Sequence, residues 1–265
     1  MDTRARVAAT YTAAADHFDS LPFWHHFGRR TVDRLRLQPG ARVLDLCCGT
    51  GASALPAAEA VGPRGSVLGV DLTDALVQQA RARAAALGLG QATFQCADVE
   101  SLTFPPASFE AIVSVFGLFF VPDMRGMLTR AWGWLAPGGQ LAITAWGQEV
   151  LAPGEALFWD AVVAEEPSLK TTGHASRLDT PEKIAAVLAA AGLPPPAIGH
   201  DRWEMPLASP EAFWPVIMGT SNRAAYHALT PLQQARVRAQ VTAQLGARRV
   251  TATAMDVLYA SARRR

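Results

Sequence analysis

The stretch "VLDLCCGTGASAL" (Val43–Leu55) joins a short apolar run to a glycine-rich segment. An apolar run of this kind followed by glycines predicts a buried strand, then a tight turn, and then a helix. The segment 49–54 also fits the two-glycine pattern of a dinucleotide-binding loop, with a small residue in place of the third glycine. Because that pattern alone is weakly specific, the ligand has to be inferred from the residues that follow the later strands.

Short apolar runs and helical patterns alternate along the chain from residue 41. Helices are expected from the glycine loop to Ala60, from Thr73 to Gly88, and around Met127–Leu135. Further strands are expected at 65–72, 92–96, 109–116 and 140–146. Strands that alternate with helices form parallel sheets with right-handed crossovers. The predicted fold class is therefore α/β: a Rossmann-like, doubly wound, mostly parallel seven-stranded sheet.

The last third of the chain has a different pattern. Three Ser/Thr-Pro pairs each predict a helix start, with a cap residue before a proline in the first turn. They are Thr180-Pro181, Ser209-Pro210 and Thr230-Pro231, and their helices are expected to end near residues 191, 220 and 245. Strand-like runs at 199–207 and 249–262 are expected to form an antiparallel pair at the sheet edge.

Composition limits the classes of protein to consider. Half of the 265 residues are hydrophobic and 18% are charged, which predicts a substantial core and argues against disorder. The net charge of +1 gives no overall field that would attract nucleic acid or an anionic membrane. The N-terminus lacks the apolar core of a signal peptide, and the longest apolar run is too short to span a bilayer. We therefore expect a soluble, cytoplasmic protein, whose C-terminal "ARRR" is frayed and solvated.

The three cysteines, Cys47, Cys48 and Cys96, show neither metal-ligand spacing nor a disulfide framework. Two adjacent cysteines and a distant third suggest a reducing compartment. No metal is expected.

Acidic residues stand at or near the expected carboxyl ends of three strands, the edge where open parallel sheets bind ligands. Asp71 lies 20 residues after Gly51 and can accept two hydrogen bonds from a ribose diol. Asp98, after the third strand, suits the exocyclic amine of adenine, whereas Asp45 would repel a pyrophosphate. The acids together predict an adenosine ligand with a positive charge and no phosphate, and S-adenosylmethionine fits that description.

Four stretches in order and at matching spacing then resemble the motifs of class I S-adenosylmethionine-dependent methyltransferases. They are "VLDLCCGTGASAL", "VLGVDLT", "FQCADVESLTFPPASFEAIVSVFGLFFVPD" and "GWLAPGGQLAITAW". The chain is most similar to the small-molecule branch that includes the quinone-biosynthesis C-methyltransferases. The resemblance covers about Val43 to Trp146, and it implies methyl transfer from S-adenosylmethionine to a small metabolite.

The resemblance also implies which residues bind the cofactor. They are Tyr11, Asp45, Cys47, Gly49, Thr50, Gly51, Asp71, Leu72, Asp98, Val99 and Ser114. Asp71 would hold the ribose, Asp98 and Val99 would contact the adenine edge, and the glycine loop would surround the methionine part. Cys47 departs from the family, which usually has glycine at this position.

Aromatic residues before the first strand and after the fourth suggest a pocket for the acceptor. Phe18, Trp24, Phe116, Phe119, Trp203 and Trp214 are expected to line it. An enclosed aromatic pocket favours a small, partly hydrophobic acceptor, methylated at oxygen, nitrogen or carbon. His25 and His26 are candidate bases because imidazole titrates near neutrality, although a base is needed only if the nucleophile starts protonated.

We expect one domain over residues 1–265. Residues 1–40 would form a helical lid, 41–147 the cofactor-binding core, and 148–265 a C-terminal part in which an insertion at about 210–246 caps the substrate. The expected partner is a small-molecule acceptor, with no nucleic acid and no membrane, and the protein is expected to be a monomer or a homodimer.

Several alternatives remain open at this point. A protein that binds S-adenosylmethionine for a non-methylating role, such as cyclisation, would have the same cofactor residues. A nicotinamide-dependent oxidoreductase is disfavoured by Asp45 and by the lack of a cation beside the glycine loop. A nucleic-acid methyltransferase is disfavoured by the charge and by the lack of an Asn/Asp-Pro-Pro-Tyr tetrad after the fourth strand. The three cysteines would also fit an enzyme that methylates arsenite, but burial of cysteine in a core explains them better.

Overall fold

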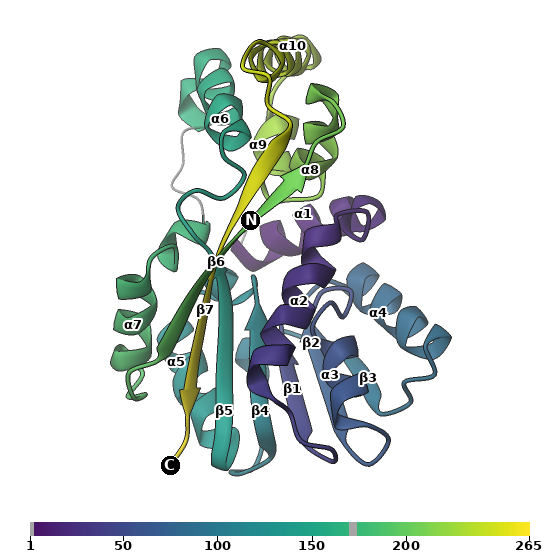
Figure 1. Cartoon of the computed structure of the whole chain (residues 1–265), viewed down its shortest axis with the longest axis vertical. Coiled ribbons are helices and arrows are strands. Elements are labelled where there is room, and N and C mark those ends of the chain that lie inside the picture. The colour runs from purple at the N-terminus through teal and green to yellow at the C-terminus, as the bar shows by residue number, and fades with distance from the viewer. Residues whose placement is uncertain (1–2, 170–173) are drawn as a thin grey trace.

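The computed structural model describes residues 3–169 and 174–265, which form a seven-stranded sheet, flanking helices and a helical layer beyond one end of the sheet (Figure 1). The strand order is β3-β2-β1-β4-β5-β7-β6. Strands β1 to β5 are parallel, and β7 runs antiparallel between β5 and β6. The bounds of the strands are β1 Arg42–Leu46, β2 Ser66–Asp71, β3 Ala92–Cys96, β4 Phe109–Val115, β5 Leu135–Trp146, β6 Ala197–Pro206 and β7 Ala252–Arg263. This confirms the predicted Rossmann-like sheet with its antiparallel edge pair.

The helices alternate with the strands in the first half of the chain and gather between strands in the second. The α-helices are α1 Thr3–Phe18, α2 Pro22–Leu35, α3 Ala54–Val61, α4 Asp74–Ala86, α5 Met124–Trp134, α6 Gly154–Glu165, α7 Pro181–Ala190, α8 Trp214–Met218, α9 Asn222–Ala228 and α10 Pro231–Ala247. The 3-10 helices are η1 Val99–Ser101, η2 Leu118–Phe120, η3 Pro167–Leu169, η4 His174–Arg177 and η5 Pro210–Phe213.

Strands β1 and β4, at the centre of the sheet, are buried on both faces, which explains why they appear in the sequence as nearly continuous apolar runs. Successive strand residues point to opposite faces. Val43 therefore packs in the core beneath α2, α3 and α4, whereas its neighbour Leu44 packs in the core that includes α5 and α7. The loops that join strands to helices are thus left at the carboxyl ends of the strands.

The helical layer lies beyond that edge of the sheet (Figure 1). Helices α8, α9 and α10 are inserted between β6 and β7, as expected, and α6 follows β5. Thr180 caps α7, and Thr230 forms a capping box with Gln233 at the start of α10. Ser209 makes no capping hydrogen bond, and Pro210 opens a 3-10 turn that leads into a short α8.

The prediction of a frayed C-terminus is wrong. The Arg264 guanidinium donates to the carbonyl oxygens of Trp132 (3.0 Å), Gly133 (2.9 Å) and Leu135. The last carbonyls of a helix have no partner within the helix, and a cation there also favours the helix dipole. The end of the chain is therefore fixed because it lies beside the end of α5.

We expect Arg264→Ala to lower the free energy of unfolding by about 1–2 kcal/mol, since it removes charge-assisted hydrogen bonds to these carbonyls. Urea unfolding followed by circular dichroism measures the change. Arg265→Ala, at an exposed neighbour, is the matched control and should change the free energy of unfolding by less than about 0.5 kcal/mol. Equal effects of the two substitutions would contradict the role given to Arg264.

Candidate functional site

A cavity lies where the loops after β1, β2, β3 and β4 meet α1 and α2. Ten residues predicted from the sequence line it: Tyr11, Phe18, Trp24, Cys47, Gly49, Asp71, Leu72, Asp98, Val99 and Phe116. The other residues that line it are Arg4, Val7, Cys48, Ala52, Ser53, Thr73, Leu76, Glu100, Val115, Gly117, Phe120, Val121 and Pro122. The structure therefore brings most of the predicted residues to one place.

Asp71 ends β2, and its carboxylate is held on both oxygens. Oδ2 accepts the backbone N–H of Gly49 (2.9 Å), and Oδ1 accepts that of Thr73 (2.8 Å). Burial raises the pKa of Asp71, and the N–H donors of Thr73 and Gly49 oppose this shift. The result is a fixed acceptor group at the cavity that also ties the glycine loop to the end of β2.

Asp98, beyond β3, is also held on both oxygens. Oδ1 accepts the backbone N–H of Glu100 (2.9 Å), and Oδ2 lies 3.0 Å from Nε of Arg4. The Arg4 guanidinium also pairs with Glu100, whose Oε1 accepts the backbone N–H of Asp123 (3.1 Å). Helix α1 therefore reaches into the site through a cation that contacts two carboxylates.

The glycine loop has a left-handed backbone at three positions: Cys47 (φ 61°), Gly49 (φ 53°) and Gly51 (φ 84°). Glycine adopts this conformation without strain, which explains why the family usually has glycine where this chain has Cys47. A Cβ added at Gly117 would lie 2.2 Å from Cβ of Cys47, so the loops after β1 and β4 touch at the floor of the cavity. Burial and nearby carboxylates raise the pKa of the Cys47 thiol.

Asp45, Thr50, Gly51 and Ser114 are not among the residues that line the cavity. Asp45 lies fully buried in β1, where its Oδ2 accepts the Ser53 hydroxyl (2.6 Å) and burial raises its pKa to about 7. The Thr50 hydroxyl donates to Asp19 (2.5 Å). The side chains of Asp45 and Thr50 thus support the glycine loop, and the assignment of Asp45, Thr50, Gly51 and Ser114 to the cofactor stays a prediction.

His25 and His26 also lie outside the cavity lining. His25 lies between Arg83 (Nη2 to Nδ1, 3.2 Å) and Asp19 (Nε2 to Oδ1, 3.4 Å). His26 stacks on Trp203 with ring centroids 4.6 Å apart. Successive residues on a helix point about 100° apart, so when Trp24 faces the cavity the next two side chains turn away from it. The prediction that these histidines act as bases has no geometric support.

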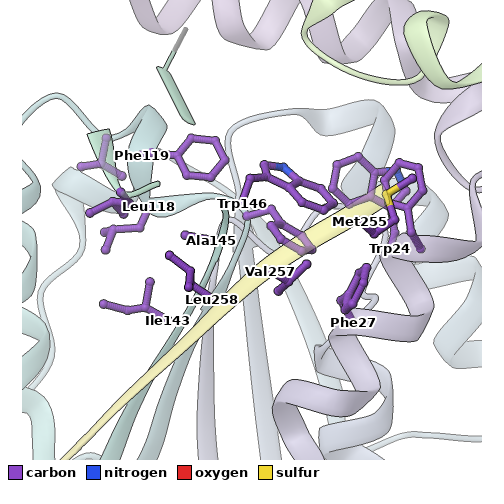
Figure 2. Close-up of a cluster of buried hydrophobic side chains, with 14 of the residues drawn as sticks. Trp24, Phe27, Leu118, Phe119, Ile143, Ala145, Trp146, Met255, Val257 and Leu258 are labelled. Atoms are coloured by element: carbon purple, nitrogen blue, oxygen red, sulfur yellow. The ribbon is translucent and has the colours of Figure 1, made fainter. Parts of the chain in front are cut away.

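The aromatic residues divide between the cavity and the core. Phe18 stacks on Trp24 (4.7 Å between centroids), and Phe116 stacks on Trp146 (3.7 Å), which makes an aromatic wall. Figure 2 shows Phe119 among the buried side chains, and its neighbour Phe120 lines the cavity instead.

Trp203 and Trp214, also expected at the acceptor pocket, do not line the cavity. Trp203 lies on the edge strand β6, against His26. Trp214 packs in the helical layer near Tyr226 and Phe158 and donates to Thr242 (3.1 Å). Trp203 therefore packs at the sheet edge and Trp214 inside the helical layer, and an aromatic residue in the sequence is as compatible with these positions as with a pocket.

Arg4 and Glu100 are the charged lining residues that sequence reasoning missed. They are 96 positions apart, and no local pattern indicates that they meet. Within residues 3–169 and 174–265, no cluster of three or more His, Cys, Asp or Glu side chains could hold a metal ion. None of the helices in these residues has the length and apolar character to cross a membrane.

A family model described as a methyltransferase domain matches residues 43–139. The chain is 29% identical over 254 residues to nocamycin O-methyltransferase of Saccharothrix syringae, covering 91% of this chain and 89% of that protein. It is 30% identical over 160 residues to demethylmenaquinone methyltransferase of Anoxybacillus flavithermus, covering 58% of this chain and 68% of that protein.

Two solved structures share the fold. YcgJ from Bacillus subtilis has a TM-score of 0.58 at 19% identity, covering 91% of this chain and 99% of that chain. The (4+2)-cyclase SpnF has a TM-score of 0.54 at 22% identity, covering 91% of this chain and 80% of that chain. At these identities the likeness concerns the fold and does not by itself indicate the reaction.

Proposed function

The chain belongs to the S-adenosylmethionine-dependent methyltransferases, and from that premise we propose that it methylates a small, partly hydrophobic or aromatic metabolite. The observation that carries the proposal is the cavity itself, where Asp71 and Asp98 stand at neighbouring strand ends beside an aromatic wall. Cavities lined mainly by apolar and aromatic side chains, with a few placed polar groups, are typical of small-molecule sites.

The cavity suits the cofactor chemically. We assign Asp71 to the ribose hydroxyls and Asp98 to the adenine amine, with Leu72 and Val99 packing on the base. Among the described lining residues Arg4 is the only arginine or lysine, and it is paired with Asp98 and Glu100. A pyrophosphate would therefore lack compensation beside the glycine loop, whereas the carboxylates offset the positive charge of a sulfonium.

The bound cofactor supplies an activated methyl group, so the protein mainly has to align the acceptor and exclude water. We assign the exclusion of water to the rings of Phe18, Trp24, Phe116 and Phe120, which line the cavity. The described lining contains no histidine or lysine, and burial raises the pKa of its Tyr11 phenol. We therefore propose an acceptor oxygen acidic enough to ionise in water near neutral pH, such as a carboxyl or enol group. The O-methyltransferase named above, which aligns over most of both chains, supports oxygen as the acceptor atom.

The proposal also assigns a role to each segment of the chain. Residues 1–40 act as a lid, because α1 supplies Arg4, Val7 and Tyr11 to the cavity, and residues 41–147 hold the cofactor. The insertion at 210–246 contributes no residue to the described lining. It supports the lid from outside, since a Cβ added at Gly219 would lie 2.3 Å from Cδ1 of Leu21, in the turn between α1 and α2.

Incubation with methyl-labelled S-adenosylmethionine and a panel of acceptors tests the proposal. We expect label to pass to an aromatic carboxylic acid or enol, with one S-adenosylhomocysteine formed per methyl, and not to matched alcohols or amines. His25→Ala and His26→Ala should keep kcat/KM within about threefold of the unchanged protein, because neither ring lines the cavity. Cofactor binding without S-adenosylhomocysteine from any acceptor would instead support a non-methylating role.

A further inference from the structure

Two polar clusters hold the ends of α1 against the loops that form the cavity. At its start, Arg4 contacts Asp98 and Glu100. Directly after its end, Asp19 accepts the Thr50 hydroxyl (2.5 Å) and lies 3.4 Å from Arg83. Both clusters involve cavity loops, so α1 cannot shift without a change at the site.

The cluster at Arg4 involves a carboxylate that the cofactor needs. Asp98 Oδ1 already accepts the Glu100 N–H, and Oδ2 faces Nε of Arg4 at 3.0 Å. The adenine amine assigned to Asp98 must therefore share or take the position of the guanidinium. The side chains of Arg4 and Asp98 are 42% and 29% exposed, so water can reach the pair and exchange is feasible.

Glu100 gives Arg4 a second partner that does not depend on Asp98. Its side chain is only 12% exposed and is fixed by the Asp123 N–H. A guanidinium that leaves Asp98 can thus stay on Glu100, which keeps α1 attached while the cavity fills. Arg4 has five N–H donors, so one partner can be lost while the other is kept.

We infer that Arg4 is a gating residue, which occupies Oδ2 of Asp98 in the free protein and yields this position as the cofactor's adenine binds. This rests on the proposed function, because it uses the role given there to Asp98. The gate lowers the rate of cofactor association and makes that rate depend on an ion pair that salt screens.

Stopped-flow mixing with S-adenosylhomocysteine tests the gate, with tryptophan fluorescence as the signal because Trp24 lines the cavity. This ligand has no net charge at neutral pH, so salt acts on the protein and not on electrostatic steering of the ligand. Arg4→Gln should bind roughly two- to fivefold faster, the effect expected for loss of a partly exposed ion pair. Raising salt from about 0.05 to about 0.5 M should speed binding to the unchanged protein and leave Arg4→Gln nearly unaffected.

Arg29→Gln is the matched control, because Arg29 forms an exposed pair with Glu59 (2.7 Å) and does not line the cavity. Glu100→Gln is a second variant, and it should slow association, because it removes the partner on which Arg4 stays after it leaves Asp98. Slower or unchanged association in Arg4→Gln, or faster association in Glu100→Gln, overturns the gate while leaving the proposed function intact. Failure of the unchanged protein to bind the ligand in equilibrium dialysis would contradict the proposed function itself.

Discussion

Asp71→Asn is expected to weaken S-adenosylmethionine binding at least about 100-fold, since hydrogen bonds to a charged partner contribute about 1.5–3 kcal/mol each. The substitution removes the charge that accepts the ribose hydroxyls. It also turns one acceptor into an amide donor opposite the N–H of Gly49 or of Thr73, which now donate to the carboxylate. The glycine loop would lose its tie to β2 at the same time. Isothermal titration calorimetry measures the affinity.

Asp74→Asn is the control for this experiment. Asp74 lies three positions further along the chain, at the exposed start of α4, and does not line the cavity. Its substitution should leave the affinity within about twofold. If Asp71→Asn, shown to be folded by circular dichroism, binds the cofactor within threefold of the unchanged protein, the assignment of the ribose to Asp71 is wrong.

Gly117→Ala is expected to lower the free energy of unfolding by about 1–3 kcal/mol, the usual effect of overpacking, and to weaken cofactor binding at least about tenfold. The added Cβ would lie 2.2 Å from Cβ and 3.1 Å from Sγ of Cys47. Gly117 has φ −114°, which any residue can adopt, so the expected loss is steric and not conformational. The two cavity loops would have to separate at the floor of the site.

A double variant separates this cause from others. Cys47→Gly removes the opposing side chain and also suits the left-handed backbone at that position (φ 61°). Cys47→Gly with Gly117→Ala should therefore bind the cofactor within about threefold of Cys47→Gly alone. Continued loss of binding in the double variant would show that contact with Cys47 is not the reason. Chemical denaturation and calorimetry on all four proteins complete the cycle.

Agreement between sequence and structure is best where the signal is local. The strands, the glycine loop and the acids that follow β2 and β3 were all predictable, because apolar runs, glycines and strand-end positions are properties of short segments. Helix α6 is an exception: its sequence GEALFWDAVVAE is apolar on too many sides to show a clear helical period. The helix expected from Ser209 is also split, into η5 and the short α8.

The amino-acid order by itself therefore determined the sheet, its parallel core and the acidic edge to which we assign the adenosine part of the cofactor. The tertiary structure alone decided which side chains face the cavity, because a one-residue step along a strand or helix reverses or rotates the direction of the side chain. Phe120 faces the cavity while Phe119 is buried, and Trp24 faces it while His25 and His26 turn away. The contact of Arg4 with Glu100, 96 positions away, exists only once α1 has packed across the strand ends.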